Sequence, residues 1–340
     1  MNELTAEYDI DSAWSSFCED GNIDNNILKN NIEDEINIPK STEIYISTKT
    51  KIAYLSQEVD LNKTFWNTEV LPYHKQEEGV IKKQMKFNFA DEESVNAIST
   101  KIEKLKNVDE YIISRIVNPS GRIKFRDVRK ISIGLCQKDI LSFRSKKRSA
   151  FYNCFVLILR VNSENKFKEI HVKVFNTGKL EIPGIRDDDV LIYTLELLVK
   201  ILRKSSGNDN ITYDLSKSET VLINSNFNCG FYLNRDKLLD ILKFKYKIDC
   251  LFDACQYPGI QCKYNYENND KKYKLSFMIF RTGSILIVGK CDEAVLFKVY
   301  EIIKEILENE YNEIYVNNFE KDKLPIKLNE KTKKRIIYVS

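Results

Sequence analysis

The side chains most often used in catalysis are scarce in this sequence. His74 and His171 are the only histidines among 340 residues. No zinc site of the HExxH type is present, and a serine or cysteine triad would have to use one of these two imidazoles. Glycine-rich phosphate-binding patterns of the forms GxxxxGK[ST] and GxGxxG are also missing from the sequence. The sequence therefore predicts a protein that is not an enzyme and uses no cofactor.

The eight cysteines do not form a familiar metal site. They stand at positions 18, 136, 154, 229, 250, 255, 262 and 291, and no two are spaced as CxxC. Cys250, Cys255 and Cys262 form a cluster whose spacing differs from that of common zinc modules. We interpret the cysteines as structural thiols in a reducing compartment and keep a metal site at the cluster as the less favoured alternative.

The composition is that of a globular chain whose charge is unevenly distributed. Hydrophobic residues make up 43% and charged residues 30%, which is enough for about two domains with cores. Residues 1–40 carry ten acidic and two basic side chains, whereas the rest of the chain carries 51 basic and 40 acidic ones. We expect an acidic disordered tail at 1–40, which either solubilises the protein or competes with a ligand of the basic body, and a basic tail at 311–340. No apolar run approaches the ~20 residues of a membrane-spanning helix, and no secretory signal is visible, so we expect an intracellular protein.

An internal repeat is the strongest signal in the sequence. Residues 172–202 and 277–307 align without a gap at an offset of 105, with eleven identities among 31 positions. The identities include Phe175/Phe280, Thr177/Thr282, Gly178/Gly283, Gly184/Gly289 and Asp187/Asp292. In each copy the pattern predicts a strand, a tight Thr-Gly hairpin, a second strand and a helix that begins after an aspartate.

Further elements upstream complete the predicted repeat unit. Strands are predicted at 151–161 and 257–266, with a strand at 221–233 and a helix at 235–246 before the second of them. The first copy has its own leading strand at 43–55. Each repeat unit is therefore predicted to contain, in order, a strand, a helix, three strands and a second helix. Two copies predict an α+β fold of about ten antiparallel strands with helices on one face.

Strand alternation predicts which side chains form the core and which face away from it. The predicted inward sets are Val172, Val174, Leu180 and Ile182 in the first copy and Phe277, Ile279, Ile285 and Ile287 in the second. The opposite set of the second copy, Met278, Phe280, Leu286 and Val288, is also apolar. That surface is either covered by another segment or used for binding, and the pattern does not separate these two alternatives.

Several motifs resemble those of the TATA-binding-protein family. FNTG and FRTG, each followed by a glycine and an aspartate-capped helix, resemble that family's SGKxVxTG hairpin. YPGIQCK at 257–263 is similar to its FPGLxYR strand, and VLINSNF at 221–227 places Asn224 at the position of a base-contacting asparagine. The wider sequence around these motifs resembles the divergent homologues of nucleocytoplasmic large DNA viruses. The resemblance covers about 41–61 and 147–310.

The resemblance implies a saddle of two pseudo-symmetric repeats, with helices on the convex face and a curved sheet that enters the DNA minor groove. Family members wedge aromatic side chains between base steps. The implied wedges are Tyr257 and Phe280 in the second repeat and Phe175 with Phe151 or Phe155 in the first. The groove would be lined by Asn224, Leu286 and Val288. The implied phosphate contacts are Lys263, Lys290, Arg160 and Lys179. The implied partners are AT-rich double-stranded DNA and other initiation factors or RNA polymerase. The implied location is a viral factory in the host cytoplasm, or the virion, or otherwise the nucleus.

The first repeat departs from the family pattern. Glu181 and Pro183 stand where the family has groove-facing valine and threonine, and Thr48 replaces the first-repeat asparagine. A carboxylate is repelled by a groove lined with phosphates, so we expect the two repeats to use DNA unequally. The alternative is a protein-binding scaffold of the transcription machinery that has lost DNA binding. An enzyme on the same fold is a third reading, against which the lack of converging acids and histidines counts.

The predicted domains follow from these observations. The first repeat spans 41–205 and contains an inserted segment at about 75–146, and the second repeat spans 215–310. The insertion includes strand-like and helix-like patterns and an NPSG turn at 118–121. It ends in SFRSKKRSAF at 142–151, a basic segment that is either a partner-binding patch or a solvated loop.

Overall fold

The computed structural model describes all residues except 1–37, 142–150, 164–165, 269–270 and 318–340. The chain divides into two compact units after Ile38, and the second unit, from Pro39 onward, holds every element described below. Nearly all of the predicted acidic tail, most of the predicted basic tail and the basic segment 142–150 lie outside the described residues.

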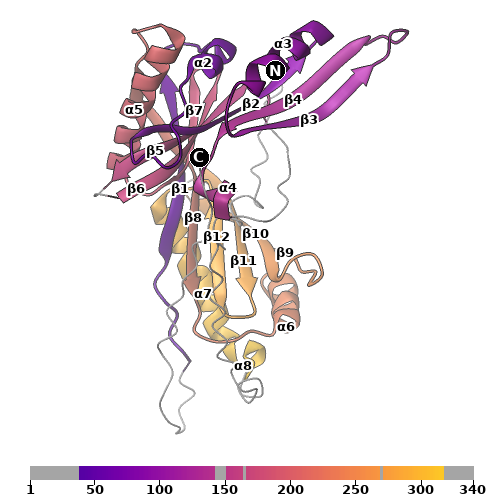
Figure 1. The fold of residues 1–340 in the computed structure, drawn as a ribbon. Coiled ribbons are helices and arrows are strands. Elements are labelled where there is room, and N and C mark those ends of the chain that lie inside the picture. Colours follow the sequence, from indigo (N-terminus) through magenta and orange to yellow (C-terminus); the bar gives the residue numbers. More distant parts are fainter. Residues whose placement is uncertain (1–37, 142–150, 164–165, 269–270, 318–340) are drawn as a thin grey trace, which may run out of the picture. The chain divides into compact units, whose positions relative to one another are not determined.

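The second unit contains one 12-stranded sheet and several helices (Figure 1). The first repeat comprises β1 (Tyr45–Leu55), α2 (Leu61–Asn67), β2 (Gly79–Phe89), β5 (Cys154–Ser163), β6 (Lys166–Phe175), β7 (Lys179–Ile185) and α5 (Asp188–Ser206). The second comprises β8 (Tyr213–Asn228), α6 (Arg235–Asp240), a π-helical turn η1 (Ile241–Lys245), β9 (Asp249–Leu251), β10 (Gly259–Asn268), β11 (Lys271–Phe280), β12 (Ser284–Gly289), α7 (Glu293–Asn309) and α8 (Tyr311–Ile314).

The strand order shows that the two repeats share one plan. It runs β3-β4-β2-β5-β6-β7-β1-β8-β12-β11-β10-β9, so each repeat places its last strand beside its first and its second strand farthest out. All of the pairs are antiparallel, and β1 pairs with β8 where the repeats meet. The predicted α+β class, with two pseudo-symmetric repeats in an open antiparallel sheet, is confirmed.

The two Thr-Gly hairpins are built alike. Gly178 and Gly283 have φ angles of 81° and 80°, which side-chain-bearing residues rarely adopt. Their amides donate to the carbonyls of Phe175 and Phe280, each at 3.0 Å. The helix that follows begins after the predicted aspartate, Asp187 in α5 and Asp292 in α7, although neither side chain makes a capping hydrogen bond.

The insertion contributes β3 (Val108–Val117), β4 (Phe125–Gly134), α3 (Glu92–Glu103) and α4 (Gln137–Leu141). It enlarges the sheet beyond the outermost strand of the first repeat, because β4 pairs with β2 and β3 pairs with β4. β2 pairs with β5 as the short β9 pairs with β10. In the sheet, β2 therefore has the position in repeat one that β9 has in repeat two. The elements that the insertion adds start after β2, within the segment 75–146.

One face of the sheet is packed against the long helices. The predicted inward residues of both repeats are all at most 1% exposed, and they pack with α5 in repeat one and α7 in repeat two. Lys49 and Lys51 of β1 bind Glu293 of α7 at 2.7 Å and Asp188 of α5 at 2.8 Å. Because both lysines reach the helix starts from one side of β1, α5 and α7 cover the same face of the sheet.

Candidate nucleic-acid interface

We call the face opposite α2, α5, α6 and α7 the outer face. In repeat two its members alternate with core residues: Met278 and Phe280 in β11, Leu286 and Val288 in β12, and Asn224 in β8. Leu286 lies opposite Met278, and Val288 lies opposite Asn224. These side chains therefore form one continuous, mainly apolar row, as the alternation predicted, in which Met278 and Leu286 are only 4% and 8% exposed.

An aromatic pair ends this surface. The rings of Tyr257 and Phe280 lie 5.9 Å apart at 56°, and the Tyr257 hydroxyl donates to Met278 Sδ at 3.5 Å. Gly259 is directly opposite Phe280, and a Cβ placed on it would lie 2.9 Å from Phe280 Cε1. The missing side chain thus makes room for the Phe280 ring. In this packing Phe280 is 9% exposed.

Asn224 lies where the two repeats join. It is opposite Thr48, and its Nδ2 donates to Thr48 Oγ1 at 3.0 Å, so the two residues that the sequence pattern equates are in contact. Asn224 Oδ1 is buried without a hydrogen-bond partner in the described part of the chain. An unsatisfied buried acceptor costs roughly 1–3 kcal/mol, a cost that a donor from a bound ligand would remove.

One end of the outer face of repeat one is covered by part of the insertion. Ile158 of β5 packs with Ile81 and Cys136 in a small cluster separate from the main cores. Lys82 binds Asp139 of α4 at 2.7 Å, and the Gln137 amide donates to Glu169 of β6 at 3.0 Å. These contacts hold α4 against β2, β5 and β6 on the side away from α5.

The histidine beneath this cover is held neutral. His171 lies opposite Ile158 in the β5–β6 pair. Burial, followed by the nearby Lys138, Lys82 and Lys173, lowers the pKa of His171 to about 4. Thus α4 covers the outer face of repeat one around Ile158 and His171, and His171 carries no charge at neutral pH, whereas the side chains of Lys173 and Glu181 on the same face remain 23% and 17% exposed.

The carboxylate that sets repeat one apart has a partner. Glu181 lies opposite Lys173, and their side chains form an ion pair at 2.7 Å. The pair places two charged groups where repeat two has the apolar Leu286 and Met278. The predicted difference in chemistry between the two outer faces is therefore present in the fold.

Two of the residues predicted to contact DNA are buried and have structural contacts. Phe155 is 0% exposed and packs against Phe65 of α2 with ring centroids 5.5 Å apart, so it belongs to the core on the helix side. Arg160 is 6% exposed and donates to the Tyr73 carbonyl at 2.8 Å and to the Lys75 carbonyl. Its guanidinium fixes the segment that leads into β2, and this use leaves it unsuited to phosphate contact.

The remaining predicted contacts lie at or near the outer face. Phe175 ends β6 with the Lys179 ammonium 6.0 Å from its ring centre. Lys263 is exposed in β10, opposite Ser276 of β11. Lys290 follows β12 and pairs with Glu219 at 3.4 Å. Phe151, the other suggested mate of Phe175, is 50% exposed with Lys173 above its ring.

Tyr152 is a candidate that the motifs missed. The offset of 105 that relates Phe280 to Phe175 also relates Tyr257 to Tyr152. Tyr152 is 60% exposed, and the Lys86 ammonium lies 3.2 Å from its ring centre. Extending the repeat alignment upstream by the same offset would have identified it.

The cysteine cluster does not assemble into a metal site. Cys250 and Cys262 face each other across β9 and β10 with Sγ atoms 3.1 Å apart, inside the core of repeat two, whereas Cys255 is exposed. Within the described ranges there is no group of three or more His, Cys, Asp or Glu side chains arranged to hold a metal ion. Likewise, no helix among the described residues is long and apolar enough to cross a membrane.

Comparison with known proteins points to one family. No family model matches the chain. A TATA-box-binding protein-like protein of Acanthamoeba polyphaga mimivirus is 26% identical over 202 residues, which cover 53% of this chain and 54% of that protein. The family resemblance predicted from the motifs is confirmed. The chain spans about half the length of this curated relative. Among solved structures, a Methanococcus jannaschii TBP matches with a TM-score of 0.37 and 14% identity, over 78% of this chain and 99% of that one.

Proposed function

We propose that this protein is a TATA-binding-protein-like transcription initiation factor that binds the minor groove of AT-rich duplex DNA through the outer face of repeat two. The observation that carries the proposal is the row that runs from the Tyr257–Phe280 pair across Leu286 and Val288 to Asn224. Minor-groove proteins that kink DNA need large apolar wedges with hydrogen-bonding groups beside them, and this row supplies both.

The proposal gives the two repeats different tasks. The outer face of repeat two contacts bases, whereas that of repeat one carries α4 and the Lys173–Glu181 ion pair. Desolvating such a pair against the groove is costly, so repeat one contributes little binding energy there. Other initiation factors or a polymerase are the implied protein partners.

A binding titration on matched duplexes tests this function. Fluorescence anisotropy with AT-rich and GC-rich duplexes of about 30 base pairs should show tighter binding to the AT-rich one. A paired Tyr257→Ala and Phe280→Ala change should abolish that preference, because removing the wedges removes the kink. Binding without any composition preference, unaffected by the paired change, would contradict the proposal.

A second function is favoured by one specific observation. Because α4 covers the outer face of repeat one around Ile158, part of the surface that the family applies to DNA is closed. A protein-binding scaffold that has lost DNA binding would fit this closure. The same titration decides between the two, since a scaffold would bind neither duplex at salt near 0.1 M.

A further inference from the structure

The insertion forms a two-stranded ribbon that extends past the sheet. β4 pairs with β2 as far as Asp127, opposite Phe89. The last two β3–β4 pairs, Ile116 with Arg126 and Val117 with Phe125, therefore lie beyond the end of β2 (Figure 1). We call residues 116–126 the ribbon tip. It belongs to the sheet edge formed by β3, at the opposite end of the strand order from β9.

The turn of the ribbon tip is well defined. The Asn118 amide donates to the Lys124 carbonyl at 2.9 Å, and the Gly121 amide donates to the Asn118 carbonyl at 3.0 Å. Pro119, at the second position of that inner turn, fixes its own φ near the value that such turns require. The ribbon tip therefore has a closed, ordered turn.

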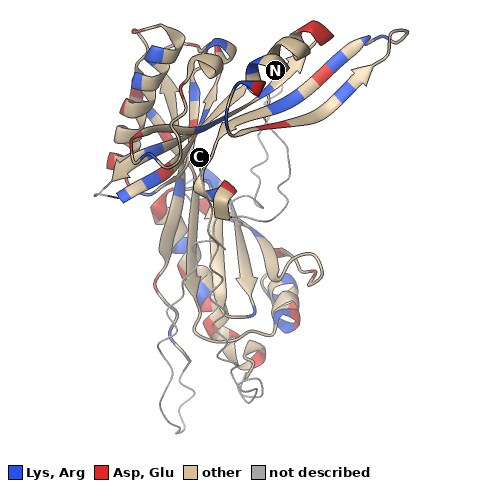
Figure 2. Cartoon of the chain, in the orientation of Figure 1, with Lys and Arg blue, Asp and Glu red and all other residues tan. Residues whose placement is uncertain are grey.

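Charge on this part of the ribbon has a single sign. Residues 111–126 include Arg115, Arg122, Lys124 and Arg126 and no aspartate or glutamate, and Figure 2 shows blue segments, which mark Lys and Arg, along the β3–β4 ribbon. Apolar side chains are exposed between these cations: Ile116 at 37%, Val117 at 61% and Ile123 at 45%. Exposed apolar groups beside clustered cations are typical of surfaces that bind nucleic acid.

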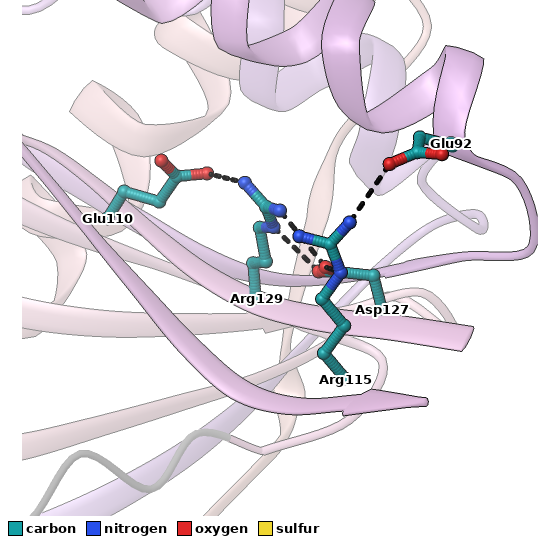
Figure 3. A network of polar contacts seen from close by, with 5 residues as sticks. All are labelled: Glu92, Glu110, Arg115, Asp127 and Arg129. Carbon is teal, nitrogen blue, oxygen red and sulfur yellow. Dashed lines mark hydrogen bonds and ion pairs between the residues drawn. The ribbon is translucent and has the colours of Figure 1, made fainter. Parts of the chain in front are cut away.

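The carboxylates nearest to the ribbon tip form ion pairs with arginines at its base (Figure 3). Arg129 binds the fully buried Asp127 at 2.6 Å and Glu110 at 2.8 Å, and these partners raise its pKa above the ordinary value. Arg115 binds Glu92 of α3 at 3.0 Å and approaches Asp127 at 3.7 Å. The network joins β3 and β4 to α3, so it fixes the direction of the ribbon. The cations of the ribbon tip lie beyond this network, and the ribbon tip itself contains no carboxylate.

We propose that the ribbon tip is a second contact site for duplex DNA, separate from the outer face of repeat two. A two-stranded β-ribbon fits a DNA groove, cations at its margins reach the phosphates, and small apolar side chains or proline fit against the groove floor. Arg122, Lys124 and Arg126 bind phosphates, while Val117 and Ile123 contact the groove. The inference rests on the proposed function in that the same duplex is bound by repeat two.

A charge-removal series in the whole protein tests the ribbon tip. The variant Arg122→Gln, Lys124→Gln, Arg126→Gln changes exposed or partly exposed side chains only. Each phosphate contact contributes about 0.9 to the slope of log affinity against log salt, so the slope should fall by roughly 2–3. Affinity at about 0.1 M salt should fall on the order of tenfold or more. The matched control is Lys200→Gln, Lys237→Gln, Lys298→Gln, which removes three exposed charges from α5, α6 and α7. The control should leave the slope unchanged to within about 0.5.

A footprint separates the two contact sites. Because the ribbon tip lies at one end of the strand order, wild-type protein should protect extra base pairs on one side of the kink only. The ribbon variant should lose this extension and keep the kink, whereas Phe280→Ala should lose the kink and keep the extension.

Each result bears on a different claim. Equal slopes and footprints for the ribbon and control variants, with wild type binding DNA, would overturn the ribbon proposal alone. Loss of binding in the ribbon variant, with no effect of Phe280→Ala, would overturn the role of repeat two and keep the ribbon. No binding by wild type would overturn both, and equal, ribbon-dependent binding to duplex RNA would replace DNA as the ligand.

Discussion

Unequal use of the two repeats gives a direct test of the interface. Phe280→Ala removes the ring that is seated on Gly259 and paired with Tyr257. Stacking of an aromatic side chain on a base is worth about 1–3 kcal/mol, which corresponds to roughly 5–150-fold in affinity. Phe175→Ala removes the equivalent ring of repeat one, whose outer face carries the Lys173–Glu181 ion pair. We expect a loss below about threefold for Phe175→Ala, since a ring that does not stack on a base loses no stacking energy.

The assay must separate binding from folding. Because Phe280 is 9% exposed, its truncation also costs stability, so Tm is measured for each variant. Phe280→Leu keeps most of the apolar volume and should preserve stability better than binding. Phe244→Ala, which truncates a 69% exposed ring of η1, is the matched control and should change neither. Affinity is read by anisotropy, and base unstacking by 2-aminopurine placed at the kink. Equal losses for Phe280→Ala and Phe175→Ala, or none for either, would refute the reasoning.

Three further predictions follow from the same contacts. Gly259→Ala should weaken DNA binding several-fold by displacing the Phe280 ring, since the added Cβ would lie 2.9 Å from it, and near-UV circular dichroism should report the displacement. Glu181→Gln should change affinity by less than about threefold because Lys173 already pairs with that carboxylate, and a large gain in a titration would place the outer face of repeat one on DNA. The free energy of unfolding should fall by up to about 3 kcal/mol as pH drops from 6.5 to 4, because the unfolded chain binds a proton that the folded His171 rejects. Urea titrations of wild type and His171→Phe check this, and parallel pH profiles would argue against it.

The order of elements within each repeat could be predicted because it depends on local sequence patterns. The Thr-Gly hairpins, the aspartates before α5 and α7, and the alternation in β6, β7, β11 and β12 each depend on residues close together in the chain. The inward sets followed from period-two alternation alone. The prediction of two pseudo-symmetric repeats required the further assumption that two similar segments fold alike, and the strand order bears that assumption out.

The burial of two residues that were predicted to contact DNA depends on contacts that are distant in sequence. Phe155 and Arg160 both lie in β5, yet Phe155 packs against Phe65 of α2 and Arg160 binds carbonyls near residue 75. Nothing local distinguishes a core phenylalanine from a wedge, or a structural arginine from a phosphate ligand. The cover formed by α4 was not foreseen either, because it depends on Lys82 meeting Asp139 across 57 residues.

If repeat two binds DNA as proposed, the insertion accounts for the different role of repeat one. Its α4 covers one end of the outer face of repeat one, and its β3–β4 ribbon carries cations at the adjacent sheet edge. If both changes belong to one adaptation, the ribbon tip supplies the phosphate-binding groups that the partly covered outer face of repeat one does not offer. The DNA footprint would then keep about its length while its sequence-reading part shrinks to the half that repeat two contacts. An interface built this way reads a shorter element than two matched repeats would, and its affinity depends more steeply on salt, since phosphate contacts replace base contacts.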